Sequence, residues 1–162
     1  MKRTICISLL VAFVITVFTG CFPNTSSMPF NGSIVFHDIT LIVPERFVRD
    51  STQSNEDLWI FERGYYKEYI IISRSNIAED TTAFLDAYAQ RMKDVGADSE
   101  IVSFNGGEAV LSKYYKDDVF CQEIFFPCGN SYYAIALRGG SEDGFKEVTD
   151  TIELMGASQM SI

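Results

Sequence analysis

Histidine and tryptophan are almost absent from this chain of 162 residues, which has one of each, His37 and Trp59. A single histidine excludes zinc sites built from several histidines, and it leaves any Ser-His or Cys-His catalytic arrangement dependent on His37. That residue precedes Asp38 in a segment where a turn is expected. Cys128, another candidate nucleophile, has no basic neighbour in the sequence that would favour a thiolate. We therefore expect no enzymatic activity, no metal and no cofactor.

Basic residues are also scarce, with 13 lysines and arginines against 22 aspartates and glutamates and a net charge of −9. An acidic domain is repelled by phosphate backbones, so nucleic acid is not an expected partner. The acidic pairs fall in predicted turns and helix starts, where such residues are common for local reasons, and none has the spacing of a calcium loop. The acidity is typical of a soluble surface.

The N-terminal segment has no charge from Thr4 to Thr19, after Lys2 and Arg3. This run of about 16 residues is shorter than the roughly 20 that a membrane-spanning helix needs. With Val17-Phe18-Thr19-Gly20 before Cys21, it resembles a bacterial lipoprotein signal, although Phe18 stands where leucine is usual. The resemblance implies that residues 1–20 are removed and that Cys21 carries a lipid. An uncleaved anchor and a plain secretory signal are the alternatives.

All these readings place the remaining chain outside the cytoplasm, and we expect a lipid anchor on the extracytoplasmic side of a membrane in the bacterial cell envelope. Removal of residues 1–20 leaves 142 residues, the size of one domain. Residues 21–32, with Pro23 and Pro29, are interpreted as the lipidated cysteine and a tether. The ten residues from 22 to 31 reach at most about 35 Å. We expect a single domain over residues 33–156 and a C-terminal tail over 157–162.

The hydrophobic pattern predicts hairpins first, then a helix, four antiparallel strands and a closing helix. The strongest turn signal is Asn105-Gly106, and Asp80 and Gly96 are the expected caps of the first helix. Gly139-Gly140-Ser141 is interpreted as a loop and N-cap rather than an anion site. The expected elements are a hairpin over Ser33–Val43, strands Leu58–Glu62 and Glu68–Ser73, helix Thr81–Val95, strands Glu100–Phe104, Glu108–Lys116, Val119–Phe126 and Tyr132–Leu137, and a helix after Ser141 with Phe145, Val148, Ile152 and Met155 buried.

This order predicts an α+β fold, an antiparallel β-sheet sandwiched by helices, with about seven to eight strands and two main helices. The expected strand from Val119 is apolar on both faces, which is typical of a strand covered on both faces. Cys121 and Cys128 would lie some 20 Å apart along it, beyond the roughly 7 Å that a disulfide allows. We expect Cys121 to be a buried thiol and Cys128 a turn residue, with a disulfide as the alternative.

The whole pattern from residue 33 to 155 resembles the PsbP-like fold, which is also found in DcrB-like envelope lipoproteins. The residues that carry the resemblance are Val43-Pro44-Glu45, Asn105 to Ala109, and Tyr132 to Ile135. These are structural turns and strands rather than catalytic residues. The resemblance implies a role in binding a partner, without a shared active site.

Two functions are therefore expected, both non-catalytic. The first is an envelope lipoprotein that binds another protein near the membrane. The alternative is a carrier or sensor of a small apolar ligand, held in a pocket between the sheet and the helix over Thr81–Val95. Aromatic residues are the candidates for a binding face in either case, namely Trp59, Tyr65, Tyr66, Tyr69, Phe84 and Tyr88.

Overall fold

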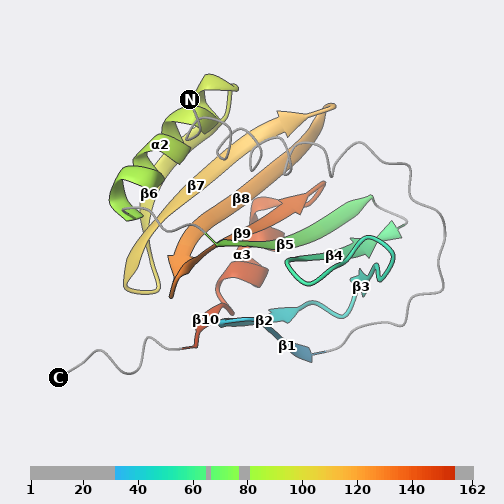
Figure 1. Cartoon of the computed structure of the whole chain (residues 1–162). Coiled ribbons are helices and arrows are strands. Elements are labelled where there is room, and N and C mark those ends of the chain that lie inside the picture. The colour runs from blue at the N-terminus through green and yellow to red at the C-terminus, as the bar shows by residue number, and fades with distance from the viewer. Residues whose placement is uncertain (1–31, 65–66, 77–80, 156–162) are drawn as a thin grey trace.

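A computed structural model describes residues 32–64, 67–76 and 81–155 of the chain (Figure 1). Cys21, Tyr65, Tyr66, Asp80 and the expected tail over 157–162 lie outside the described residues. The elements in chain order are β1 (Gly32–Phe36), β2 (Ile39–Val43), β3 (Val48–Arg49), β4 (Leu58–Arg63), β5 (Glu68–Asn76), α2 (Thr81–Asp94), β6 (Asp98–Phe104), β7 (Gly107–Lys116), β8 (Val119–Cys128), β9 (Ser131–Arg138), α3 (Glu142–Thr149) and β10 (Glu153–Leu154).

The described strands form two antiparallel sheets. A large sheet has the order β3-β4-β5-β9-β8-β7-β6, and a small sheet has the order β1-β2-β10. Helix α2 lies on one face of the large sheet, and α3 lies with the small sheet on the other face (Figure 1). This arrangement confirms the predicted α+β class with two helices. It adds a separate small sheet, because the first hairpin pairs with β10 instead of joining the large sheet.

Strand β8, in the interior of the large sheet, is buried on both sides, as its sequence predicted. Ile124 and Phe126 point into the core beneath the small sheet, whereas Phe125 between them packs under α2. The two layers of apolar side chains on either face hold the helix and the small sheet to the same strand. The predicted turns are also confirmed, since Asn105 and Gly106 have φ values of 48° and 81° and the Ser141 side chain accepts a hydrogen bond from the Gly144 amide.

The expectation that Cys128 is a turn residue is wrong, because β8 continues through Cys128 and the turn is at Gly129 and Asn130. The strand tolerates Pro127 for a geometric reason. Cys128 and Ser131 form the hydrogen-bonded pair that closes the hairpin, so the next pair, Pro127 and Tyr132, is a non-hydrogen-bonded pair. Pro127 therefore needs no backbone N–H to bond β9. The described pairing with β7 ends before this point, at Phe125. Cys121 and Cys128 therefore lie on one strand, and both are buried free thiols.

The closing helix is shorter than predicted. It ends at Thr149, and the expected buried stripe continues only through Phe145 and Val148. The hydroxyls of Thr149 and Thr151 donate hydrogen bonds to backbone carbonyls of the helix. Such bonds compete with the helical hydrogen bonds of the backbone. Ile152 is still buried but lies beyond the helix, and Met155 is exposed because the chain there pairs as β10 with β2.

Candidate functional site

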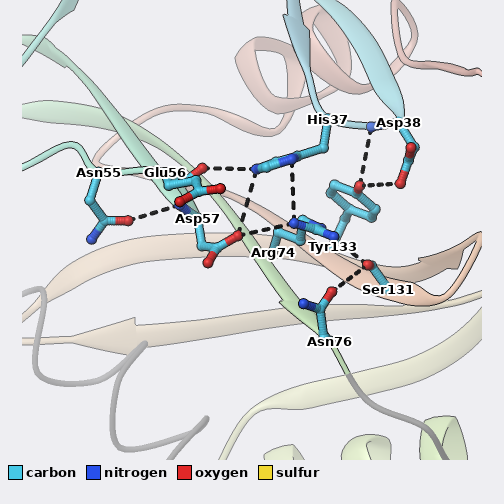
Figure 2. Close-up of polar contacts among 9 residues, drawn as sticks. All are labelled: His37, Asp38, Asn55, Glu56, Asp57, Arg74, Asn76, Ser131 and Tyr133. Atoms are coloured by element: carbon cyan, nitrogen blue, oxygen red, sulfur yellow. Dashed lines mark hydrogen bonds and ion pairs between the residues drawn. The ribbon is translucent and has the colours of Figure 1, made fainter.

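The tip of the β1–β2 hairpin carries the chain's single histidine and brings together four segments that are distant in sequence (Figure 2). His37 has a positive φ of 54°, which is uncommon for a residue other than glycine. This confirms its prediction as a turn residue. The polar side chains around it form what we call the hairpin-tip cluster, which comprises His37, Asp38, Asn55, Glu56, Asp57, Arg74, Asn76, Ser131 and Tyr133.

Both ring nitrogens of His37 have partners in the cluster. Nε2 lies 2.9 Å from the backbone carbonyl of Glu56 and 3.6 Å from Oδ1 of Asp57. Nδ1 lies 3.3 Å from Nη1 of Arg74. Because a guanidinium group only donates, Nδ1 is assigned as the acceptor and the ring proton is assigned to Nε2, which donates to Glu56.

Arg74 lies at the centre of the cluster and joins the hairpin tip to the large sheet (Figure 2). Nη1 donates to Oδ1 of Asp57 at 3.3 Å as well as to His37. Nε donates to the hydroxyl of Ser131 at 3.1 Å, and that hydroxyl donates in turn to Oδ1 of Asn76 at 2.8 Å. Arg74 on β5 thus joins the turn at His37, the loop at Asp57 and strand β9, and holds these segments together.

Asp38 forms the second half of the cluster. The hydroxyl of Tyr133 donates to Oδ2 of Asp38 at 3.0 Å and accepts from the Asp38 amide at 3.2 Å. The Asp38 carbonyl accepts from the amide of Met155 at 2.7 Å and from the thiol of Cys128 at 3.6 Å. Burial, together with the charge of Asp38, raises the pKa of Tyr133 to about 12. Burial also raises the pKa of the Cys128 thiol.

These contacts hold the hairpin of the small sheet against the large sheet. A buried thiol whose pKa is raised is protonated at neutral pH and is a poor nucleophile. Each ring nitrogen of His37 already has a hydrogen-bonding neighbour, and the Cys128 thiol donates to the backbone carbonyl of Asp38. Over the described ranges, no group of three His, Cys, Asp or Glu residues is arranged to hold a metal ion.

A second polar feature lies under α2. Glu123, in the middle of β8, is only 1% exposed. Its Oε1 accepts from the Tyr88 hydroxyl at 2.5 Å, while Oε2 is buried without a hydrogen-bond partner among the described groups. Burial raises the pKa of Glu123 to about 7, and the Tyr88 hydrogen bond opposes the rise. Glu123 is not among the residues predicted from the sequence, although a charged residue inside an apolar strand is a visible signal.

The four proposed binding-face aromatics that the structure describes, Trp59, Tyr69, Phe84 and Tyr88, do not form one exposed face. Trp59 packs against the core on the side of the small sheet, where its ring contacts Phe36. The Cζ atom of Arg49 lies over the same ring, 4.0 Å from its centroid. Tyr69 lies on the opposite face of the large sheet. Phe84 and Tyr88 are 4% and 2% exposed and belong to the core under α2.

The space between α2 and the sheet is filled by aromatic rings. Tyr88 stacks on Phe125 with ring centroids 4.0 Å apart, and Phe125 stacks on Tyr132 at 5.2 Å. Phe84 lies 4.5 Å from the ring of Tyr132. Phe84 and Tyr88, which were expected to line a pocket for an apolar ligand, are therefore packed against rings of the sheet.

The clearest exposed apolar surface is on the small sheet. Val35 and Ile42 are 55% and 49% exposed, and they alternate with buried neighbours, so both point away from the core. We call this side of β1 and β2 the outer face. This face was not predicted from the sequence, although apolar residues that point to both faces of a short hairpin indicate that both faces are covered.

The chain forms an α+β domain in which the hairpin-tip cluster bonds the β1–β2 hairpin to the large sheet. No protein-family model matches the chain, and no curated protein matches it. A protein of similar fold is known from a 1.50 Å crystal structure from Bacteroides thetaiotaomicron VPI-5482, with a TM-score of 0.53 and 12% identity over 80% of this chain. The present chain spans 51% of that protein's length. At this identity the similarity concerns the fold alone.

Among the helices that the structure describes, none is long and apolar enough to cross a membrane.

Proposed function

We propose that this chain is a non-catalytic lipoprotein of the bacterial cell envelope, anchored through Cys21, which binds a protein partner close to the membrane through the outer face of its small sheet. The observation that carries the proposal is the pair Val35 and Ile42, each about half exposed on that face. Exposed apolar side chains on a rigid sheet are a typical interaction surface. The resemblance to PsbP-like domains supports the same role.

The position of the outer face fits a partner near the membrane. Strand β1 begins at Gly32, the last residue of the expected tether. A tether of ten residues keeps β1 within about 35 Å of a lipid on Cys21. The outer face is thus in the part of the domain nearest in sequence to the anchor.

The hairpin-tip cluster supports binding rather than catalysis. Its hydrogen bonds tie Asp38 and His37 to the large sheet through Tyr133 and Arg74. The outer face is therefore ordered before any partner arrives, which reduces the entropy lost on binding.

Photo-crosslinking in the living cell tests the proposed surface. A photoreactive residue in place of Ile42 is expected to capture a protein, whereas the same residue in place of Ile101, 40% exposed on the edge strand β6, is the matched control. Equal capture at both positions, or none at Ile42, would contradict the proposed surface.

The lipid anchor has an independent test. Cys21→Ser is expected to release the protein from the membrane fraction or to leave it as an unprocessed precursor. Intact mass and membrane fractionation measure both outcomes. A variant that remains membrane-bound and normally processed, with no mass difference beyond the substitution itself, would show that Cys21 carries no lipid.

A further inference from the structure

The small sheet ends in a strand edge that differs from the other edges of the described chain. The edge strands are β1 and β10 in the small sheet and β3 and β6 in the large sheet. Strands β3 and β10 have only two residues each, and β6 carries Asp98 and Glu100, both exposed. Short length and exposed charge are the usual protections of an edge. Strand β1, five residues long, has the sequence GSIVF with no charge and no proline.

The register shows which backbone groups β1 presents. Phe36 and Ile39 close the two-residue hairpin, so they form a hydrogen-bonded pair. Alternation then directs the N–H and C=O groups of Ile34 and Gly32 towards β2. Those of Ser33 and Val35 point away from β2, and the described residues include no strand on that side. We call this side of β1 its open edge.

We propose that the open edge of β1 pairs with β1 of a second copy of this chain, antiparallel about a two-fold axis, to form a continuous sheet across a homodimer. The two-fold axis passes through Ile34, so that Ser33 of each copy faces Val35 of the other. This register lets both residues that point outwards exchange their N–H···O=C bonds with the partner copy. A register centred on Val35 retains the exchange between the two Val35 residues but pairs Ser33 with His37 of the turn, so the hydrogen bonds of Ser33 are lost.

The side chains suit this register. On the outer face Ser33 lies beside Ile42 of its own copy, so the small serine faces the larger valine of the second copy. Val35 and Ile42 from both copies then form one apolar strip across the dimer. The pairing strands carry no charge, which matters because each chain has a net charge of −9.

The anchors also favour a second copy as the occupant, and this step rests on the proposed lipidation of Cys21. In the proposed register the two Gly32 residues lie about 13 Å apart along the paired strands. Two tethers of up to about 35 Å can reach one membrane from such nearby points. Confinement to one membrane raises the effective concentration of each copy for the other.

Disulfide crosslinking of the full-length protein in its own membranes tests the register. Cells that contain Ser33→Cys and Val35→Cys copies together are expected to form a disulfide-linked dimer under mild oxidation. Each variant alone is expected to give little, because its two cysteines lie roughly 8 to 9 Å apart, beyond disulfide reach. Cys121 and Cys128 are buried and provide a low background. The matched control on the charged edge pairs Ile101→Cys with Ser103→Cys copies.

A charge at the open edge provides the second arm. Val35→Lys changes a half-exposed residue on the outer face, so the core is retained. It is expected to abolish the dimer, measured by mass after chemical crosslinking, while Ile101→Lys leaves it in place. Membrane fractionation of both variants confirms that anchoring is unchanged.

Three results would overturn the homodimer. A protein that remains monomeric in the membrane, with anchoring and Ile42 capture intact, would refute self-pairing and leave the proposed function standing. Capture of a different protein at Val35 would assign the open edge to that partner. Equal crosslinking at the β6 control pair would show random collision. A dimer that persists in Cys21→Ser after anchoring is lost would support the homodimer and show that it does not depend on the tethers.

Discussion

Glu123 makes the stability of this protein depend on pH in a direction opposite to that of most acidic residues. The carboxyl group is buried beneath α2, and burial raises its pKa from an ordinary 4.5 to about 7. Between these values the folded protein binds a proton that the unfolded chain has lost. Stability is therefore greatest below pH 4.5, falls as the pH rises towards 7, and changes little from this group beyond that point.

The substitution Glu123→Gln removes the titration and keeps an oxygen that can accept from Tyr88. Each pKa unit corresponds to about 1.4 kcal/mol, so the full effect of Glu123 is about 3 kcal/mol. Most of that difference develops between pH 5 and pH 8, which gives an expected change of about 2 to 3 kcal/mol. The variant is thus expected to gain stability relative to the natural protein as the pH rises.

Urea unfolding at several pH values measures this difference. Trp59 is the single tryptophan and is half-buried against Phe36, so its fluorescence reports on the core. The difference between variant and natural protein is the quantity to follow, because all other acidic groups titrate equally in both. Parallel stability curves from pH 5 to pH 8 would refute the reasoning and show that Glu123 is ionised in the folded protein.

Two further predictions concern buried hydroxyls. Tyr133→Phe removes both hydrogen bonds to Asp38 and is expected to cost about 1 to 2 kcal/mol in urea unfolding, whereas Tyr115→Phe, with Tyr115 75% exposed, is the control and costs little. An equal loss in both would contradict the role of the cluster. The hydroxyls of Ser99 and Ser112 lie 2.7 Å apart and are buried; each single change to alanine is expected to cost about 1 to 3 kcal/mol, and the double change less than the two together. Strict additivity in this cycle would contradict the bond.

The features that were predicted correctly are those determined by neighbours in the sequence. Asn105-Gly106 forms its tight turn because both residues accept a positive φ. Helix α2 follows the spacing of Phe84, Leu85 and Tyr88 along one face, and all three are buried. Such signals require only a few adjacent residues, so they survive without knowledge of the tertiary fold.

The features that were missed depend on pairing between distant segments. The apolar spacing from Phe145 to Met155 predicts one long helix, yet Leu154 pairs instead with Ile39, more than a hundred residues earlier. The hairpin-tip cluster unites His37 with Arg74 and Asp57 for the same reason. No local pattern records which sheet a hairpin joins, so the candidate site was not predictable from the sequence.

The hairpin-tip cluster connects this missed geometry to the proposed function. A hairpin of two five-residue strands is marginally stable by itself. Asp38 holds its tip from both sides, through Tyr133 and through the amide of Met155, which follows β10. The hairpin that presents Val35 and Ile42 is thus held in place by contacts at its tip. If a partner binds to the outer face, Tyr133→Phe is expected to weaken that binding although Tyr133 does not contact the partner. A variant that loses stability but binds the partner as before would show that binding does not depend on the hydrogen bonds between Tyr133 and Asp38.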